Sequence, residues 1–182
     1  MNWLIFALVA YLMLILESGF SSVTFLGDVS FLLILLVYVG LMAPAPVVAW
    51  SSLVVGLLMD LRPGPVEHII IGPVALGCLV GTYALLQLRS FVFRQSIFTI
   101  TVMVFAVGIF LQIIVVTLFS ARGMQFITAE PIPGWNAADQ LAGRFVDLIY
   151  TAIATVPVGF ILLRFARIFS FPGLTHAERK YR

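Results

Sequence analysis

The chain has 182 residues, of which 62% are hydrophobic and 10% are charged, with a formal net charge of +2. A soluble domain carries about 25% charged residues, so this chain has too few to cover a water-exposed surface. The composition therefore predicts an integral membrane protein. It excludes a cytoplasmic enzyme, a nucleic-acid-binding module and a disordered tail.

Six apolar segments are candidates to cross a bilayer, which requires about 20 mostly apolar residues per helix. Apolar and polar residues do not alternate along them, as they would in barrel strands. We therefore expect an all-α fold, a polytopic membrane protein that forms one domain, a bundle of six transmembrane helices. In the second segment, Leu35 is expected to face lipid. The segments cover residues 3–20, 29–43, 47–61, 69–88, 97–119 and 145–165, and a basic tail follows at 166–182.

Basic residues are distributed unevenly between the two sides of this predicted bundle. The side with both termini carries seven and the other side carries three, so the positive-inside rule places both termini in the cytoplasm. No basic leader precedes the first segment, so we expect it to remain as a mature span. The seven are Arg89, Arg94, Arg164, Arg167, Arg179, Lys180 and Arg182, and the three are Arg62, Arg122 and Arg144.

The longest loop, 120–144, is predicted to lie outside, where a functional element and a simple lid over the bundle are equally good explanations. Within it, Asn136 and Asp139 are suited to cap a short interfacial helix that leads into the last span.

Three acids within the spans are candidate functional residues, because an ionisable side chain in a membrane helix is costly and usually has a role. They are Glu17, Asp60 and Asp147. All three lie near the ends of their segments. A side chain that simply reaches headgroup water is therefore an equally good explanation for each.

The third segment has small residues on one helix face that ends in a carboxylate. Ser52, Gly56 and Asp60 are four residues apart and share that face, which we call the Ser52–Asp60 stripe. Small residues let membrane helices approach closely, whereas an acid on that face is costly against lipid. We therefore expect Asp60 to face protein and to accept from Arg62, from Arg144 or from the backbone that follows.

Two further segments show comparable patterns. Gly77 and Gly81 form a small-residue face on the fourth segment, which serves either internal packing, which we favour, or dimerisation. Arg144 is three residues before Asp147 and is expected to pair with it at the start of the last span. Gln112 in the fifth segment is expected to form an interhelical hydrogen bond.

No motif for catalysis is present in the sequence. It has no histidine pair at metal-ligand spacing, no phosphate-binding glycine loop and no nucleophile beside an evident base. The single cysteine, Cys78, lies in an apolar run and excludes an intrachain disulfide. We therefore predict a scaffold or a binder with no catalytic residue, metal or cofactor. The polar residues expected at the outer end form one candidate cluster: Arg62, Glu67, His68, Arg144 and Asp147.

The segment from Gly27 to Gln95 resembles MreD, an integral membrane protein of the bacterial rod-shape system. The apolar run FLLILLVYVGLMAPAP is followed by SLVVGLLMDLRPG and by a glycine-bearing span that ends in the basic LRSFVFRQ. A pattern over 145–167 also fits. The chain departs from the family at 66–68, where an apolar residue and glycine are common, and in the 120–144 loop. The most recognisable signature is Gly56, Asp60, Leu61 and Gly64.

This resemblance implies a six-helix bundle in the bacterial inner membrane, similar to the substrate-binding subunits of energy-coupling-factor vitamin transporters. It also implies a non-catalytic role in cell shape and lateral peptidoglycan synthesis. The implied partners are a bitopic MreC-like protein, a RodA-type glycan polymerase with its transpeptidase, indirectly the MreB filament, and membrane lipid, but no nucleic acid.

The main alternative is a membrane subunit that binds a vitamin or another small molecule for a transporter, because it would share the six-span fold. Such a subunit should enclose an outer pocket of roughly 300 Å³ or more with several convergent polar groups. A lipid-modifying membrane enzyme is a third class. It would need clustered acids or histidines in one span, and the sequence has none.

Overall fold

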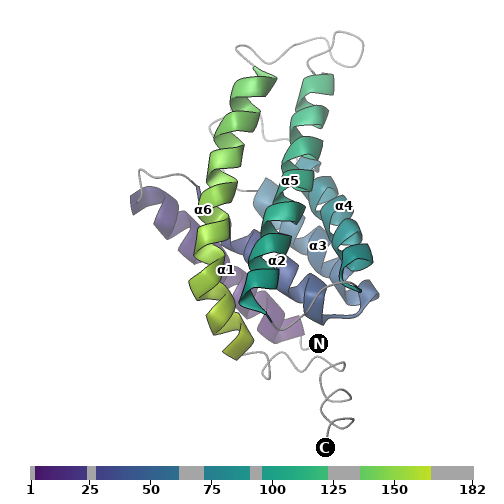
Figure 1. The fold of residues 1–182 in the computed structure, drawn as a ribbon, viewed down its shortest axis with the longest axis vertical. Helices are drawn as coiled ribbons and strands as arrows, with labels where there is room; N and C mark the ends of the chain where they lie inside the picture. Colours follow the sequence, from purple (N-terminus) through teal and green to yellow (C-terminus); the bar gives the residue numbers. More distant parts are fainter. Residues whose placement is uncertain (1–2, 24–27, 62–71, 91–95, 123–135, 165–182) are drawn as a thin grey trace, which may run out of the picture.

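The computed structural model describes residues 3–23, 28–61, 72–90, 96–122 and 136–164, with the backbone alone at 21–23 and 122. Within these residues it contains six helices and no strand, which confirms the expected all-helical class (Figure 1). The helices are α1 (Trp3–Val23), α2 (Phe31–Met42), α3 (Ala45–Asp60), α4 (Pro73–Leu88), α5 (Ile97–Arg122) and α6 (Ala137–Arg164).

Three of these helices, α1, α5 and α6, are long and apolar enough to cross a membrane. The other three are apolar but shorter, with 12 residues in α2 and 16 each in α3 and α4. At 1.5 Å per residue they are about 18 and 24 Å long, less than the roughly 30 Å of a hydrocarbon core. The helices are thus compatible with a membrane protein, and half of those described have the full length of a span.

The last helix begins earlier than expected from its apolar pattern, at Ala137 instead of residue 145. Asn136 caps it, because its Oδ1 accepts from the N–H of Ala138 at 3.1 Å and its carbonyl accepts from the N–H of Gln140 at 3.0 Å. The short helix expected near 136–139 is therefore the first turn of α6. Because this first turn is polar, a search for apolar segments does not include it and places the start of the helix too late.

The centre of the bundle is α2. All twelve of its residues are buried, and it contacts each of the other five helices (Figure 1). A helix that is apolar on every side is typical of such an enclosed position. The expectation that Leu35 faces lipid is wrong, because its side chain has no exposed area. An all-apolar sequence carries no sign of whether protein or lipid surrounds it.

The α5–α6 hairpin extends beyond the other helices at one end of the bundle (Figure 1). α5 has 26 residues and α6 has 28, so each is roughly 40 Å long. The exposed first turn of α6, with Asp139 and Gln140, lies on this extension. The hairpin therefore carries polar groups past the apolar body of the bundle.

We predict that Leu35→Ala destabilises the protein by about 2–5 kcal/mol, because it removes packing contacts and leaves a cavity in an enclosed helix. The matched control is Leu8→Ala on α1, where the leucine is 60% exposed, and the expected change is within about 0.5 kcal/mol. Unfolding in detergent micelles, followed by circular dichroism, measures both. Equal loss for the two variants would contradict the central position of α2.

Candidate functional site

Asp60, at the end of α3, binds the start of the next helix. Its two carboxylate oxygens accept from the N–H groups of Gly72 at 2.9 Å, Val74 at 3.1 Å and Ala75 at 3.0 Å. These are among the first N–H groups of α4, whose own cap residue, Gly72, has no side chain to accept them. A negative charge there is also favoured by the helix dipole. Asp60 therefore caps α4 from the neighbouring helix.

Gly56 allows α3 and α4 to approach closely enough for this cap. A Cβ atom added to Gly56 would overlap the Cα of Ala75, so no larger residue fits without a shift of the backbone. The buried Ser52, one turn earlier on the same face, donates to the carbonyl of Ala49 at 2.8 Å. The Ser52–Asp60 stripe is thus part of the internal α3–α4 contact. Its glycine sets the separation and its acid binds the helix start.

The small-residue face of α4 also packs inside the bundle. A Cβ atom on Gly77 would lie 3.3 Å from Cγ of Leu111, and one on Gly81 would lie 3.1 Å from Cγ1 of Val107. Both neighbours belong to α5. Of the two interpretations that the sequence leaves open, the structure places these glycines in internal packing.

The first N–H groups around the start of α2 are bound by two other helices. Glu17 of α1, only 4% exposed, accepts from the N–H of Leu32 at 3.2 Å. On α6, Thr151 Oγ1 accepts from the N–H of Ser30 at 3.1 Å, and Asp147 accepts from the N–H of Asp28 at 3.1 Å. The Glu17–Leu32 bond is buried, so it removes a desolvation cost that an unpaired N–H would carry there, whereas the Asp28–Asp147 bond is exposed.

The opposite end of α2 is bound by a cation. Arg89, just after α4, donates from Nη1 to the carbonyl of Ala43, the C-cap residue of α2, at 2.8 Å. The central helix therefore has an acid at its positive end and a guanidinium at its negative end, which is the favourable arrangement for both. The sequence identified Arg89 only as a topology charge. Its place after a span, in a loop with Arg94, gives no sign of this role.

Arg144 and Asp147, predicted to pair on α6, interact electrostatically and also have different hydrogen-bond partners. Arg144 donates from Nη1 to Oε1 of Gln112 on α5 at 3.1 Å, which is the interhelical hydrogen bond expected of Gln112. Asp147 instead accepts from the backbone of Asp28, as described above. Arg144 and Asp147 thus tie α6 to α5 and to the start of α2.

The remaining candidate residues lie at the end of α3 and in the loop after it. Leu61 is the C-cap of α3, with its N–H donating to the carbonyl of Leu57 at 3.0 Å. The other four, Arg62, Gly64, Glu67 and His68, lie outside the described residues. The predicted outer cluster is therefore described only at Arg144 and Asp147.

An apolar groove of about 460 Å³ lies between α1 and α3. Trp3, Phe6 and Tyr11 line one wall, and Val54 and Leu58 line the other. Its volume is in the range of small-molecule pockets, but this lining lacks the convergent polar groups that a vitamin would require. In the part of the chain that the structure describes, no group of three or more His, Cys, Asp or Glu residues is arranged to hold a metal ion.

No protein-family model, curated protein or solved structure matches this chain. The chemistry of the site therefore has to be inferred from its own geometry. The three acids of the described helices that were singled out as functional candidates, Glu17, Asp60 and Asp147, each accept from backbone N–H groups near the start of another helix. This arrangement is suited to holding helices together.

We predict that Gly56→Ala destabilises the protein by about 1–3 kcal/mol, because the new methyl group would overlap the backbone of α4. Gly143→Ala on α6 is the matched control, since a Cβ atom there meets nothing within 4 Å. The control should be neutral or stabilising by up to about 1 kcal/mol, the difference in helix propensity. Melting curves of both variants in the same detergent test this, and a neutral Gly56→Ala would refute the close contact.

We predict that Asp60→Ala costs about 1.5–3 kcal/mol, because it leaves the first N–H groups of α4 without their charged acceptor. Asp60→Asn keeps one oxygen and should recover part of that loss. Hydrogen exchange over residues 72–76, monitored by mass spectrometry, should rise in Asp60→Ala and less in Asp60→Asn. Unchanged exchange there in both variants would show that Asp60 does not cap α4.

Proposed function

We propose that this chain is an MreD-like, non-catalytic membrane scaffold of the bacterial rod-shape system. In this proposal all six helices lie in the inner membrane with both termini in the cytoplasm. The protein supports cell shape and lateral peptidoglycan synthesis through contact with a bitopic MreC-like partner. The glycan polymerase and transpeptidase of the elongation complex then assemble with that pair, and the MreB filament is reached indirectly.

The observation that best supports a scaffolding role is that the acids within the helices bind backbone groups of other helices. A charged carboxylate within a bilayer has a high free-energy cost. The carboxylates of Glu17, Asp60 and Asp147 each accept from backbone N–H groups near the start of another helix. A carboxylate bound in this way is poorly placed to exchange protons with a substrate. These polar groups thus hold the helices in a fixed arrangement, as a docking platform requires.

The resemblance to MreD supports the same proposal through the residues that carry it. Gly56 and Asp60, the most recognisable part of the signature, are the two residues that bring α3 and α4 together. Signature residues that only hold helices together are expected in a protein that works by binding partners on its surface. The rod-shape partners themselves come from the resemblance alone.

The short length of α2 is compatible with a membrane location. Non-helical backbone at membrane depth is tolerated where protein encloses it and satisfies its polar groups. Glu17, Thr151 and Arg89 provide that satisfaction at the two ends of α2. A six-helix bundle with one enclosed, short helix is therefore physically reasonable in a bilayer.

The orientation with cytoplasmic termini rests on the seven-to-three distribution of basic residues. Exposed Arg164 at the end of α6 and Arg89 after α4 belong to the side with more charges. α1 begins with the exposed Trp3, a residue type that favours the membrane–water interface.

A fusion of green fluorescent protein after Arg182 tests location, orientation and partners together. Expressed at native level in the source bacterium, the fusion should fluoresce in the envelope, because this reporter matures in the cytoplasm. Capture through the reporter should recover an MreC-like protein and a RodA-type polymerase, identified by mass spectrometry. Depletion of the chain should convert rods to rounded cells.

Variants of the fusion relate partner recovery to the α3–α4 contact. Gly56→Leu should reduce recovery of the MreC-like protein more than Asp60→Ala does, with Leu8→Ala as the lipid-facing control. Recovery is compared at matched amounts of monodisperse protein. The proposal fails if depleted cells stay rod-shaped and the unaltered fusion recovers no rod-system protein.

A further inference from the structure

Trp50 on α3 and Tyr83 on α4 are large aromatic side chains on the outer surface of the bundle, and each is 64% exposed. α3 and α4 pack on each other and on α2, so their exposed side chains lie on the side away from the bundle centre. Val54, Leu76 and Val80 are exposed on the same side. We call these five residues the α3–α4 face.

The two aromatic residues lie at almost the same height. The two helices are antiparallel, because Asp60 at the end of α3 binds the first N–H groups of α4. Gly56 and Ala75 lie against each other. Trp50 is six residues before the former and Tyr83 is eight residues after the latter, which is the same direction along the antiparallel pair. At 1.5 Å per residue, their Cα atoms differ in height by about 3 Å.

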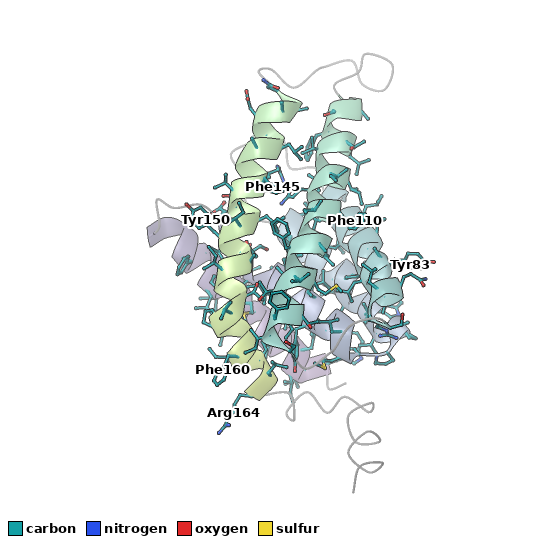
Figure 2. All side chains as sticks on the ribbon, in the orientation of Figure 1. Tyr83, Phe110, Phe145, Tyr150, Phe160 and Arg164 are labelled. Carbon is teal, nitrogen blue, oxygen red and sulfur yellow. The ribbon has the colours of Figure 1, made fainter. Side chains whose placement is uncertain are left out.

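This height is near the middle of the apolar surface of the protein. The large exposed apolar side chains of α6 run from Leu141 to Ile161, about 30 Å along the helix axis, which is the thickness of a hydrocarbon core. Figure 2 shows Tyr83 between the heights of Phe145 and Phe160 of α6. In the membrane location proposed above, both aromatic residues are therefore more than about 10 Å from either edge of the hydrocarbon, farther than their side chains extend.

The polar tips of these side chains need hydrogen-bond partners at that depth. Within the residues that the structure describes, neither the indole N–H of Trp50 nor the hydroxyl of Tyr83 has one. Lipid tails offer no acceptor, and a polar group without a partner in an apolar medium is costly. Tryptophan and tyrosine are also enriched at protein interfaces. The α3–α4 face is therefore better suited to contact with another protein surface than to lipid.

A second copy of this chain supplies the matching groups. The indole N–H only donates, whereas the tyrosine hydroxyl both donates and accepts. A twofold axis along the bilayer normal leaves every residue at its own height and sets α3 of one copy against α4 of the other. Because Trp50 and Tyr83 differ by only about 3 Å in height, the tryptophan of each copy then meets the tyrosine of the other.

We propose that two copies of the chain associate through their α3–α4 faces, with Trp50 of each copy donating to the Tyr83 hydroxyl of the other. Val54, Leu76 and Val80 provide the close packing around these bonds, which membrane helices need because lipid gives them no hydrophobic reason to associate. The inference rests on the membrane location proposed above and is independent of the rod-shape partners.

Disulfide cross-linking in vesicles tests which surface joins the copies. The full chain with Cys78→Ala, which removes its single cysteine, is reconstituted in phosphatidylcholine vesicles with Val80→Cys on the α3–α4 face or Ile153→Cys on α6. Val80 is 42% exposed and Ile153 is 63% exposed, so exposure alone favours the control. Oxidation with copper phenanthroline should give several times more cross-linked dimer from Val80→Cys than from Ile153→Cys.

Energy transfer between copies that carry a donor or an acceptor fluorescent protein after Arg182 measures the dimer without added cysteines, over a series of protein-to-lipid ratios. Trp50→Phe and Tyr83→Phe each remove one polar tip and should weaken association by at least about threefold. The double variant should be about as weak as either single variant, because all three lose the same bonds. Tyr11→Phe on α1, where the tyrosine is 65% exposed, is the matched control and should leave association unchanged.

A chain that stays monomeric at every ratio, or a dimer that Trp50→Phe and Tyr83→Phe leave unchanged, would overturn the inference. Cross-linking of Val80→Cys in native membranes to a different protein alone would also overturn it, because that protein then covers the face. Flotation of the vesicles separates these failures from that of the proposed location, which is contradicted if the chain does not float with the lipid.

Discussion

The structure depends on the enclosure of a short central helix and on the need to satisfy its ends. α2 has 12 residues and every one is buried, so the polar backbone groups at its ends need protein partners. A backbone N–H or carbonyl without a partner in such surroundings costs as much as a lost hydrogen bond or more. Glu17, Thr151 and Arg89 supply the partners from α1, α6 and the end of α4. The outer helices are thereby tied to the central one at defined points.

The contact between α3 and α4 solves the same problem with two residues. Glycine at position 56 removes the side chain at the point of closest approach, and Asp60 one turn later accepts the N–H groups that this approach presents. Further glycines carry the packing from α4 to α5 and from α5 to α6. In the membrane location proposed here, lipid tails give helices little hydrophobic reason to associate, so close packing and such polar contacts would supply the attraction.

The use of the few buried charged residues to bind helix ends is consistent with the proposed role. Charged residues within apolar helices often mark transport or proton transfer, but here they hold the ends of helices. A rigid bundle is a suitable platform for a bitopic partner.

Much of the architecture can be predicted from the residues themselves. The composition and the apolar segments determine an all-helical, membrane-compatible fold. The spacing of Ser52, Gly56 and Asp60 places an acid on a packed face. Asn136 marks the start of α6 because capping is a local interaction between a side chain and the adjacent backbone.

The tertiary structure alone decides which apolar surfaces meet protein and which remain outside. Leu35 is enclosed and Leu8 is exposed, although both lie in uniformly apolar segments. The partners of Glu17 and Arg89 likewise come from helices distant in sequence. The physical reason is that lipid and a protein interior are equally apolar, so a hydrophobic pattern does not distinguish them. Only the packing of small residues and the placement of buried polar groups resolves that choice, and both depend on contacts between separate helices.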